Sequence, residues 1–490
     1  MAAAVLAHAD ETPDKIALSV VSLSKSQRWS YARLKSAVLA AGTGFLQAGL
    51  SAGDRIMLRL DNTPDFPIAF LGAIAVGMIP IPTSPQLTAP EITKLATKTN
   101  PKLIIVGSAQ IALPNGDWPV IDVTTFRTWE DLPEADIVLG DPDRPAYIIF
   151  TSGTGGTPHT VVHAHRAIWA RRMMWRGWYD LKQSDRILHA GAFNWTFTLG
   201  TGLMDPWSIG ATALIPAPGI APPELPLLLK RHDATLFAAA PGVYRQMLRG
   251  TFPTLPKLRH GLSAGEKMHE KTRQAWINAT GTAVHEAYGM SECSTFISGS
   301  PDRPAPSGSL GYAQDGRRIS IRESGKAVPL NEHGMIAVHR SDPGLMIGYL
   351  DDEEAMNDKF EGEWFLTGDL GVMGEDGAIT YAGRADDMMN AGGFRVSPLE
   401  VENAMLEHAA ISEVAACEII VNDGVGIIGL FYKAHKAIDS AELEEFARTR
   451  LARYKVPRAY IAVDQLPRGT NNKLLRRKLR QDWESQNGQT

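Results

Sequence analysis

The sequence predicts an α/β protein with two domains: a large N-terminal domain of α/β layers that includes a small β-rich subdomain, and a small α+β C-terminal domain. Three observations lead to this fold class. At 490 residues the chain is too long for one compact core. Helical and strand-like apolar patterns alternate over the first 145 residues, which is typical of α/β layers. Residues 385–490 carry an apolar pattern of their own, so we place the two domains at 1–384 and 385–490.

Composition and charge argue against several classes of function. Hydrophobic residues make up 44% of the chain and charged residues 21%, as in an ordinary globular protein. The net charge of -5 gives no reason to expect nucleic acid or an anionic membrane as a partner. Two cysteines cannot form a disulfide framework and suit a reducing compartment. The N-terminus has no basic leader, and the longest uncharged run, residues 66–90, is interrupted by proline and glycine. We therefore expect a soluble cytoplasmic protein.

The first 145 residues are expected to form scaffold. Residues 31–48 carry apolar side chains at helical spacing, which predicts a helix. Residues 56–60 and 102–107 are strand-like, and the second segment is apolar enough for a buried parallel strand. We assign no chemistry to these segments.

A glycine-rich stretch follows directly after the uncharged residues 148–150. Between residues 151 and 158 it holds three glycines, three threonines and one serine. Glycines let successive backbone N–H groups turn inward and hydroxyls add donors, so the stretch predicts a phosphate-binding loop, with a plain surface loop as the alternative. His163 and His165 lie two residues apart, a spacing that could bind a metal on a strand. No Cys or carboxylate cluster accompanies them, which favours structural histidines.

Later loops contribute further candidate binding residues. Phe193, Asn194 and Trp195 follow a strand-like segment and predict pocket walls, with core packing as the alternative. Residues 258–267 again place small residues after a strand-like run. The stretch 284–292 combines an aromatic ring, a glycine, a hydroxyl and a carboxylate. These are the groups that a site for a purine, a phosphate and Mg²⁺ needs. Glu292 is the Mg²⁺ candidate, whereas the neighbouring Cys293 has no evident partner base.

Short strands and acidic turns over residues 307–384 predict the β-rich subdomain. Asp369 follows a Thr-Gly pair within it. A carboxylate only accepts hydrogen bonds, so Asp369 suits a ribose diol, with an ordinary turn aspartate as the alternative.

The C-terminal domain is expected to begin its first helix at residue 398. Ser397 and Glu400 have the spacing of a capping box, with a proline at the first helical position. Asp439 is expected to cap a second helix that runs to Arg453. Lys473 lies in a polar loop ahead of a basic helix.

Taken together and in this order, these stretches resemble the adenylate-forming superfamily of acyl-CoA synthetases, nonribosomal adenylation domains and luciferases. The resemblance covers residues 12–480 and rests on five motifs at the right intervals. The P-loop signature of kinases and GTPases is absent. The resemblance implies an acid–thiol ligase, an AMP-forming acyl-CoA synthetase. The enzyme would form acyl-AMP and pyrophosphate from a carboxylic acid and Mg-ATP, then pass the acyl group to coenzyme A.

The resemblance also implies roles for residues. It makes Lys473, Glu292 and Thr154 catalytic, with Glu292 as the Mg²⁺ ligand. It makes Asp386 the hinge of a mobile C-terminal domain. It assigns cofactor binding to the phosphate loop (Thr151, Ser152, Gly153, Gly155, Gly156), the adenine stretches (Gly265, Glu266, Ala287, Tyr288, Gly289, Met290, Ser291), the ribose pair (Asp369, Arg384) and the segment of Gly392, Gly393 and Arg395.

One position in the sequence limits the class of carboxylic acid that we expect as substrate. Amino-acid-activating members usually carry an aspartate where this chain has Asn194, and an unpaired ammonium in a closed pocket is costly. We therefore expect a carboxylic acid without an α-amine, and free coenzyme A as the thiol because no carrier segment follows Lys473. Benzoate and short- or medium-chain acyl-CoA ligases are most similar; aryl or alkyl acid stays open, as does monomer or homodimer. The alternatives are an enzyme that loads a carrier-protein thiol and a nucleotide-binding homologue with reduced ligase activity.

The glycine loop departs from the usual pattern Thr-Ser-Gly-Thr-Thr-Gly-x-Pro-Lys-Gly. Gly155 replaces a threonine, His159 the lysine and Thr160 the final glycine. An imidazole titrates near neutral pH, whereas a lysine keeps its charge. We expect a weaker hold on the β- and γ-phosphates, and a lower KM for ATP at pH 8 in a His159→Lys variant.

Overall fold

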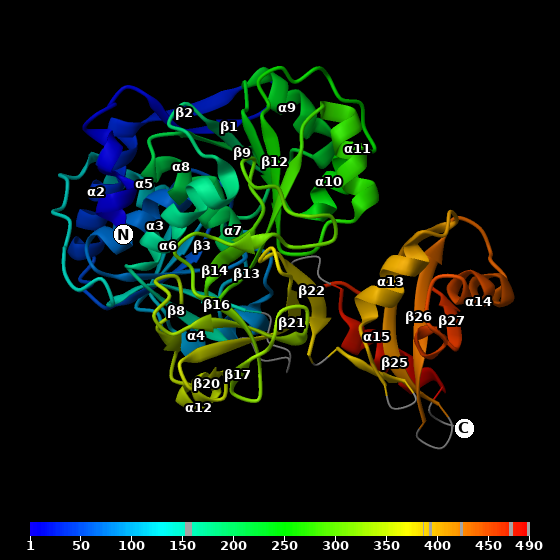
Figure 1. Cartoon of the computed structure of the whole chain (residues 1–490). Coiled ribbons are helices and arrows are strands. Elements are labelled where there is room, and N and C mark those ends of the chain that lie inside the picture. The colour runs from blue at the N-terminus through cyan, green and yellow to red at the C-terminus, as the bar shows by residue number, and fades with distance from the viewer. Residues whose placement is uncertain (152–158, 386, 392–393, 422–424, 470–473, 488–490) are drawn as a thin grey trace. The chain divides into compact units, whose positions relative to one another are not determined.

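The computed structural model describes residues 1–151, 159–385, 387–391, 394–421, 425–469 and 474–487 (Figure 1). It divides into two compact units, residues 1–318 with 338–364 and residues 319–337 with 365–490. The β-rich residues 319–337 and 365–384 therefore cluster with the C-terminal part of the chain. The domain boundary at 384/385 stays a prediction.

The first unit is built on a nine-stranded sheet in the order β15-β14-β13-β12-β11-β9-β10-β1-β2. The pairs from β13 to β1 are parallel, and antiparallel strands lie at both ends. Because the carboxyl ends of parallel strands meet at one edge, the loops after β9, β12 and β13 emerge together. The strands are β1 (Ile16–Val21), β2 (Ser26–Ser30), β9 (Arg186–His189), β10 (Thr212–Pro216), β11 (Leu236–Ala239), β12 (His260–Ala264), β13 (Val284–Met290), β14 (Ser294–Ser298) and β15 (Tyr312–Ala313).

Two hydrophobic clusters cover the two faces of this sheet. Leu188 and Phe237 pack with α9 (Leu225–Arg231), α10 (Pro241–Met247) and α11 (Glu270–Thr280). Their neighbours Ile187 and Leu236 point to the other face, toward α6 (Ala167–Met174), the π-helical turn Trp175–Tyr179 and α7 (Thr196–Leu199). Figure 1 shows α10 and α11 beside one face and α7 and α8 (Asp205–Ser208) beside the other.

Two smaller sheets and further helices complete the first unit. One sheet is parallel, in the order β4-β3-β5-β6, and the other is antiparallel, in the order β19-β8-β7. The helix expected at 31–48 and the strands expected at 56–60 and 102–107 are present as α2, β3 and β5. The elements are α1 (Ala2–Val5), α2 (Tyr31–Gln47), α3 (Asp65–Ala75), α4 (Ala89–Thr99), α5 (Val123–Arg127), α12 (Glu353–Asn357), β3 (Arg55–Arg59), β4 (Ile79–Pro82), β5 (Leu103–Val106), β6 (Val120–Asp122), β7 (Pro145–Phe150), β8 (Thr160–Ala164), β19 (Gly348–Tyr349) and β20 (Phe360–Glu361).

The second unit combines short antiparallel strands with an α+β layer. Its three-stranded sheet β25-β26-β27 carries a core of its own against α13 and α14. The elements are β16 (Ile319–Glu323), β17 (Lys326–Ala327), β18 (His333–His339), β21 (Trp364–Met373), β22 (Ile379–Arg384), β23 (Met389–Ala391), β24 (Phe394–Val396), α13 (Pro398–Leu406), β25 (Ile411–Val421), β26 (Val425–Ala434), α14 (Ser440–Arg448), β27 (Ala459–Ala462) and α15 (Arg476–Asn487).

Helix α13 begins where the sequence predicts, but without the expected capping box. The Ser397 hydroxyl donates to the Ala382 carbonyl at 2.6 Å, and Glu400 pairs with Lys455 instead. The capping-box prediction is therefore wrong, because both side chains find distant partners. Asp439 does cap α14, by accepting from the Ala441 N–H, but that helix ends at Arg448 rather than Arg453.

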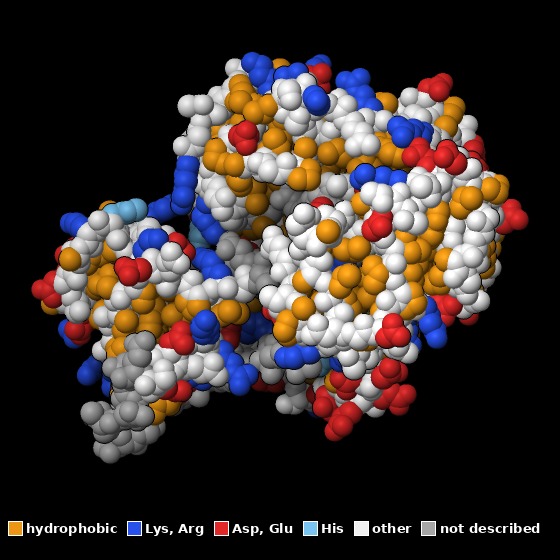
Figure 2. Space-filling view, turned by 180° about the vertical axis from the view of Figure 1, so that it is seen from behind, with side chains coloured by type: hydrophobic (Ala, Val, Ile, Leu, Met, Phe, Trp, Pro, Cys, Tyr) orange, Lys and Arg blue, Asp and Glu red, His pale blue; other side chains and the backbone are white. Residues whose placement is uncertain are grey.

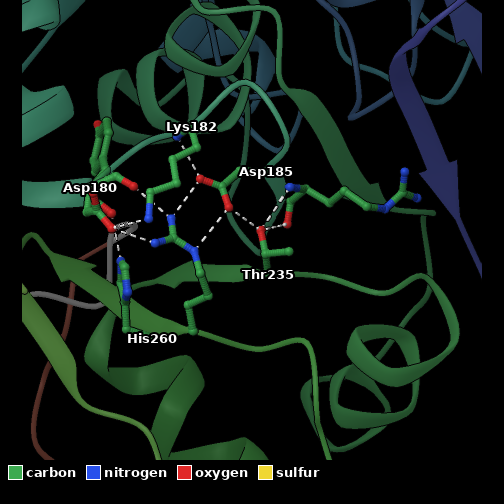
Figure 3. Close-up of polar contacts among 8 residues, drawn as sticks. Asp180, Lys182, Asp185, Thr235 and His260 are labelled. Carbon is green, nitrogen blue, oxygen red and sulfur yellow. Dashed lines mark hydrogen bonds and ion pairs between the residues drawn. The ribbon is translucent and has the colours of Figure 1, made fainter.

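A polar network joins three strands of the large sheet near their amino ends (Figure 3). Arg259, just before β12, donates to Asp180 at 2.6 Å and to Asp185 at 2.7 Å. The other oxygen of Asp185 accepts from the Thr235 hydroxyl at 2.7 Å. The network ties the starts of β9, β11 and β12 together, at the end of the sheet opposite to the loops that follow β9, β12 and β13.

The surface seen in Figure 2 carries basic and acidic side chains interspersed with apolar ones. Among the described residues, no helix is long and apolar enough to cross a membrane.

Candidate active site

The loops at the carboxyl edge of the large sheet bring Trp195, Gly265 and Tyr288 into one region. Gly265 follows β12 with a φ of +100°, and a Cβ placed on it would lie 2.7 Å from the Trp195 ring. Both the backbone conformation and the close approach therefore require glycine. Tyr288, near the end of β13, is half-buried and meets Phe296 edge to face at 5.3 Å. Two half-buried aromatic rings thus lie at the edge where ligands bind in parallel α/β sheets.

Glycine is also required at position 289, where β13 and β14 come together. A Cβ on Gly289 would lie 2.1 Å from the Ser294 carbonyl oxygen. Burial falls along this part of the chain: Ala287 is buried, whereas Met290 and Ser291 are half-buried.

Glu292 is 7% exposed and is held by residues from other elements. Its Oε1 accepts a hydrogen bond from the Tyr349 hydroxyl at 2.9 Å, and its carbonyl accepts from the Met346 N–H at 2.7 Å. Burial, with the Glu292 carboxylate nearby, raises the pKa of Tyr349 well above its usual value. The Tyr349 hydroxyl therefore remains a donor, and it fixes one carboxylate oxygen.

The ring of Tyr349 packs against His159, the histidine that replaces the usual lysine. The rings of His159 and Tyr349 stack at 4.6 Å with an angle of 29° between their planes. His159 Nδ1 lies 3.9 Å from the Asp352 carboxylate. The Thr151 N–H donates to the His159 carbonyl at 3.0 Å and so closes the base of the glycine loop. His159 and Glu292 therefore share one aromatic neighbour, Tyr349.

His163 and His165 behave as structural histidines. Burial lowers the pKa of His163 to about 4 and that of His165 to about 3, so both rings are neutral near pH 7. His163 Nε2 lies 2.7 Å from the Ser291 carbonyl and supports the turn that carries Glu292. Among the described residues, no group of three or more His, Cys, Asp or Glu could hold a metal ion. Cys293 is fully buried, and burial raises the pKa of its thiol, so it is a poor nucleophile.

Asp369 and Arg384, in the second unit, are brought together by the β21–β22 hairpin, in which they are direct partners. Arg384 Nη1 lies 3.4 Å from Asp369 Oδ1, and the Tyr381 hydroxyl donates to the same oxygen at 3.3 Å. A Cβ on Gly368 would lie 3.0 Å from the Arg384 guanidinium. Asp369 and Arg384 therefore lie side by side, with the carboxylate 8% exposed, and their role in binding ribose stays a prediction.

The loop after β9 is anchored by its first aromatic residue. Phe193 is 1% exposed and packs on Phe66 at 5.2 Å, and its N–H donates to Asn62 Oδ1. Asn194 and Trp195 are half-buried. Phe193 thus belongs to the core, while the next two residues are the ones that can line a pocket.

Several predicted residues lie outside the part of the chain that the structure describes. They are Ser152, Gly153, Thr154, Gly155, Gly156, Asp386, Gly392, Gly393 and Lys473. Arg395 is in β24, but its side chain is not among those described. Sequence reasoning missed Tyr349 and the support that His163 gives to Ser291, because nothing local in either stretch points to its distant partner.

Known protein families and individual relatives match nearly the whole chain. The family of AMP-binding enzymes matches residues 5–350, and the AMP-binding enzyme C-terminal domain matches residues 400–473. The mitochondrial acyl-coenzyme A synthetase ACSM5 of Mus musculus is 30% identical over 93% of this chain and 85% of its own length. The Homo sapiens relative ACSM2A is 27% identical over 94% and 85%.

Solved structures show the same fold. A benzoate CoA ligase from Burkholderia xenovorans LB400 has a TM-score of 0.87 and 26% identity, covering 98% of this chain and 99% of its own. ATP-bound MatB from Rhodopseudomonas palustris has a TM-score of 0.90 at 24% identity, with 99% of both chains covered.

Proposed function

The chain belongs to the family of AMP-binding enzymes, and we propose that it is an AMP-forming carboxylate–coenzyme A ligase. The observation that carries this function is the match to acyl-coenzyme A synthetases over 93% of the chain. An oxygen of the acid attacks the α-phosphorus of ATP, and the bond to pyrophosphate breaks to leave acyl-AMP. The thiol of coenzyme A then attacks the acyl carbon, loses its proton, and displaces AMP.

The first step brings an anion to a polyanion, so catalysis rests on positioning and on compensating charge. We assign this work to the glycine loop after Thr151, which binds phosphates, and to Lys473, which bridges the carboxylate and the α-phosphate. Asp369 and Arg384 bind the ribose. Tyr288 and Gly289, with Gly265, Glu266, Ala287, Met290 and Ser291, bind the adenine side of the nucleotide.

The residues present fit a magnesium ion. Mg²⁺ usually takes one or two protein carboxylates and completes its shell with phosphates and water. Glu292 offers one such carboxylate, buried to 7% exposure and fixed through Oε1 by Tyr349. Bound there with ATP, the ion would neutralise phosphate charge, while Tyr349 and the Ser291 turn hold the carboxylate in place.

The second step is assigned to the second unit. Asp386 is the proposed hinge, and Gly392, Gly393 and Arg395 the proposed segment for coenzyme A. Glycine suits that segment because pantetheine must pass close to the backbone.

The acid is proposed to lack an α-amine. Asn194 occupies the position where an ammonium partner would be needed, and a neutral amide cannot balance that charge. Aryl acids and short- or medium-chain alkyl acids both fit, and the benzoate CoA ligase among the similar structures favours including aryl acids in any test. We propose a cytoplasmic location, although the curated relatives are named as mitochondrial.

The test is pyrophosphate release with ATP, Mg²⁺ and a panel of aliphatic and aromatic acids, with and without coenzyme A. The proposal expects release with at least one acid and a coenzyme A thioester as product. Release without any thioester would favour carrier-protein loading. If the protein binds ATP but releases pyrophosphate with none of the acids, the result would favour the nucleotide-binding alternative.

A further inference from the structure

A cavity of about 640 Å³ lies within the first unit. Its walls come from the β1–β2 hairpin, α2, the start of α3, α5 with the turn after it, and the loop that follows β10. Small-molecule sites usually have volumes of about 300–1,000 Å³, whereas protein interiors hold few voids larger than a water molecule. None of the described residues that we propose to bind nucleotide, acid or coenzyme A lines this cavity. It is therefore a candidate for a second ligand site.

The floor of the cavity is apolar. Ala37 and Ala41 of α2, Ile68 of α3 and Phe126 of α5 line it, and all four are buried. Trp129, in the turn after α5, is half-buried and meets the Phe126 ring edge to face at 5.4 Å. Aromatic and aliphatic walls of this kind favour a ligand with an apolar body, either an aromatic ring system or an alkyl chain.

The charged side chains of the lining leave one cation without a partner. Asp65 accepts two hydrogen bonds from Arg127, at 2.9 and 2.8 Å. Glu130 accepts two from Arg33, at 3.1 and 3.0 Å. The remaining charged residue, Lys25, is exposed, and its ammonium has no hydrogen bond or ion pair among the described residues. Because each pair is neutral overall, the lining carries one net positive charge, which suits a ligand with one anionic group.

The segment just before α3 connects the cavity to the loop after β9. Thr63, which lines the cavity, directly follows Asn62. The Asn62 amide donates to the Gly191 carbonyl at 2.6 Å, and Asn62 Oδ1 accepts from the Phe193 N–H at 3.0 Å. Asn62 thus supports the turn that leads directly into residues 194–195 of the proposed acid pocket. A ligand that shifts Thr63 would therefore move this support.

We propose that this cavity is a regulatory site for an amphipathic carboxylate, with the apolar body on the buried floor and the carboxylate beside Lys25. The occupied cavity changes the affinity of the acid pocket by way of Asn62, and by linkage the acid changes the affinity of the cavity by the same factor. Binding to the cavity does not depend on the proposed ligase function, whereas the coupling rests on it. A second molecule of the acid substrate and an unrelated carboxylate share this chemistry, and kinetics separate the two sources.

Binding is measured by isothermal titration calorimetry, with 2-naphthoate as the probe and 2-naphthamide as its neutral counterpart. A probe of this size should bind the wild-type protein with a Kd of about 0.1–1 mM. Lys25→Glu should raise the Kd of 2-naphthoate about threefold or more at low ionic strength and leave that of the amide unchanged. Gln27→Trp should raise both about tenfold or more, because residue 27 is exposed on β2 and lines the cavity, which the indole then fills.

Arg28→Glu is the matched control for charge. It makes the same change as Lys25→Glu in the same hairpin, but successive side chains of a strand point to opposite faces, and Arg28 does not line the cavity. It should leave both dissociation constants unchanged. Equal binding of 2-naphthoate to the wild type, Lys25→Glu and Gln27→Trp would show that the cavity does not bind it and that the inference is wrong.

The coupling is measured by pyrophosphate release against an accepted acid, with and without 2-naphthoate. In the wild type, saturating probe should change the KM for the acid by about fivefold or more. The change should disappear in Gln27→Trp, which fills the cavity, and in Asn62→Ala, which still binds the probe. If the acid itself is the ligand, the wild-type rate should depart from a hyperbola as the acid concentration rises, and Gln27→Trp should restore the hyperbola.

Three results would contradict the coupling. A change in KM that persists in Gln27→Trp would mean that the probe competes in the acid pocket. An unchanged KM in the wild type at saturating probe would mean that the two sites are independent. No pyrophosphate release with any acid would contradict the ligase function and the coupling with it, whereas the measured binding to the cavity would stand.

Discussion

Replacing Tyr349 by phenylalanine removes the hydroxyl that donates to Glu292 Oε1 at 2.9 Å and leaves the ring that stacks on His159 at 4.6 Å. A hydrogen bond to a charged group contributes about 1.5–3 kcal/mol, and 1.4 kcal/mol corresponds to about a factor of ten. If Tyr349 holds the carboxylate for Mg²⁺, the variant should need about 10- to 100-fold more free Mg²⁺ for half-maximal pyrophosphate release. At saturating Mg²⁺ and ATP its rate should recover most of the wild-type value.

The assay is pyrophosphate release at fixed ATP over a range of free Mg²⁺. Tyr31→Phe is the matched control, because the buried Tyr31 hydroxyl donates to the Ala211 carbonyl at 2.6 Å, away from Glu292. It should lower thermal stability without moving the Mg²⁺ curve. Superimposable Mg²⁺ curves for Tyr349→Phe and wild type would refute the positioning role and weaken the case for Glu292 as the metal ligand.

Three other changes test separate parts of the account. His159→Lys should lower the KM for ATP at pH 8, because a lysine keeps its positive charge there; an unchanged or higher KM at pH 8 would mean that His159 only packs on its neighbour. Arg171→Met should destabilise the protein by about 3–5 kcal/mol in urea unfolding, because it strands a fully buried Asp205, and adding Asp205→Leu should recover part of the loss; equal losses in the single and double variants would contradict this. Lys473→Ala should lower the rate of acyl-AMP formation by about 10²–10³ while ATP still binds, and a near-normal rate would remove it from the mechanism.

The scaffold was predictable wherever local pattern and burial agree. The helix of residues 31–47 and the strands of residues 55–59 and 103–106 follow from apolar spacing that packing then satisfies. The start of α13 followed from Pro398, which is favourable at a first helical position and unfavourable later. The capping box failed because Ser397 and Glu400 each found a partner far away in sequence, which no local rule anticipates.

Individual residues of the candidate site were predictable, but most of their contacts with one another were not. The resemblance implied that Asp369 and Arg384 act as a pair, but the hairpin register that makes them direct partners in β21 and β22 was not predicted. Tyr349 lies 57 positions from Glu292 and was not predictable, because a tyrosine in a short strand can have many other roles.

The most direct test of the central claim follows an oxygen atom. An accepted acid labelled with ¹⁸O in both carboxylate oxygens is incubated with the protein, ATP, Mg²⁺ and coenzyme A, and the AMP is analysed by mass spectrometry. Attack of the carboxylate on the α-phosphorus predicts one ¹⁸O in the phosphate of every AMP, together with one equivalent each of pyrophosphate and acyl-coenzyme A. Unlabelled AMP, or ADP in its place, would contradict adenylate formation by this chain.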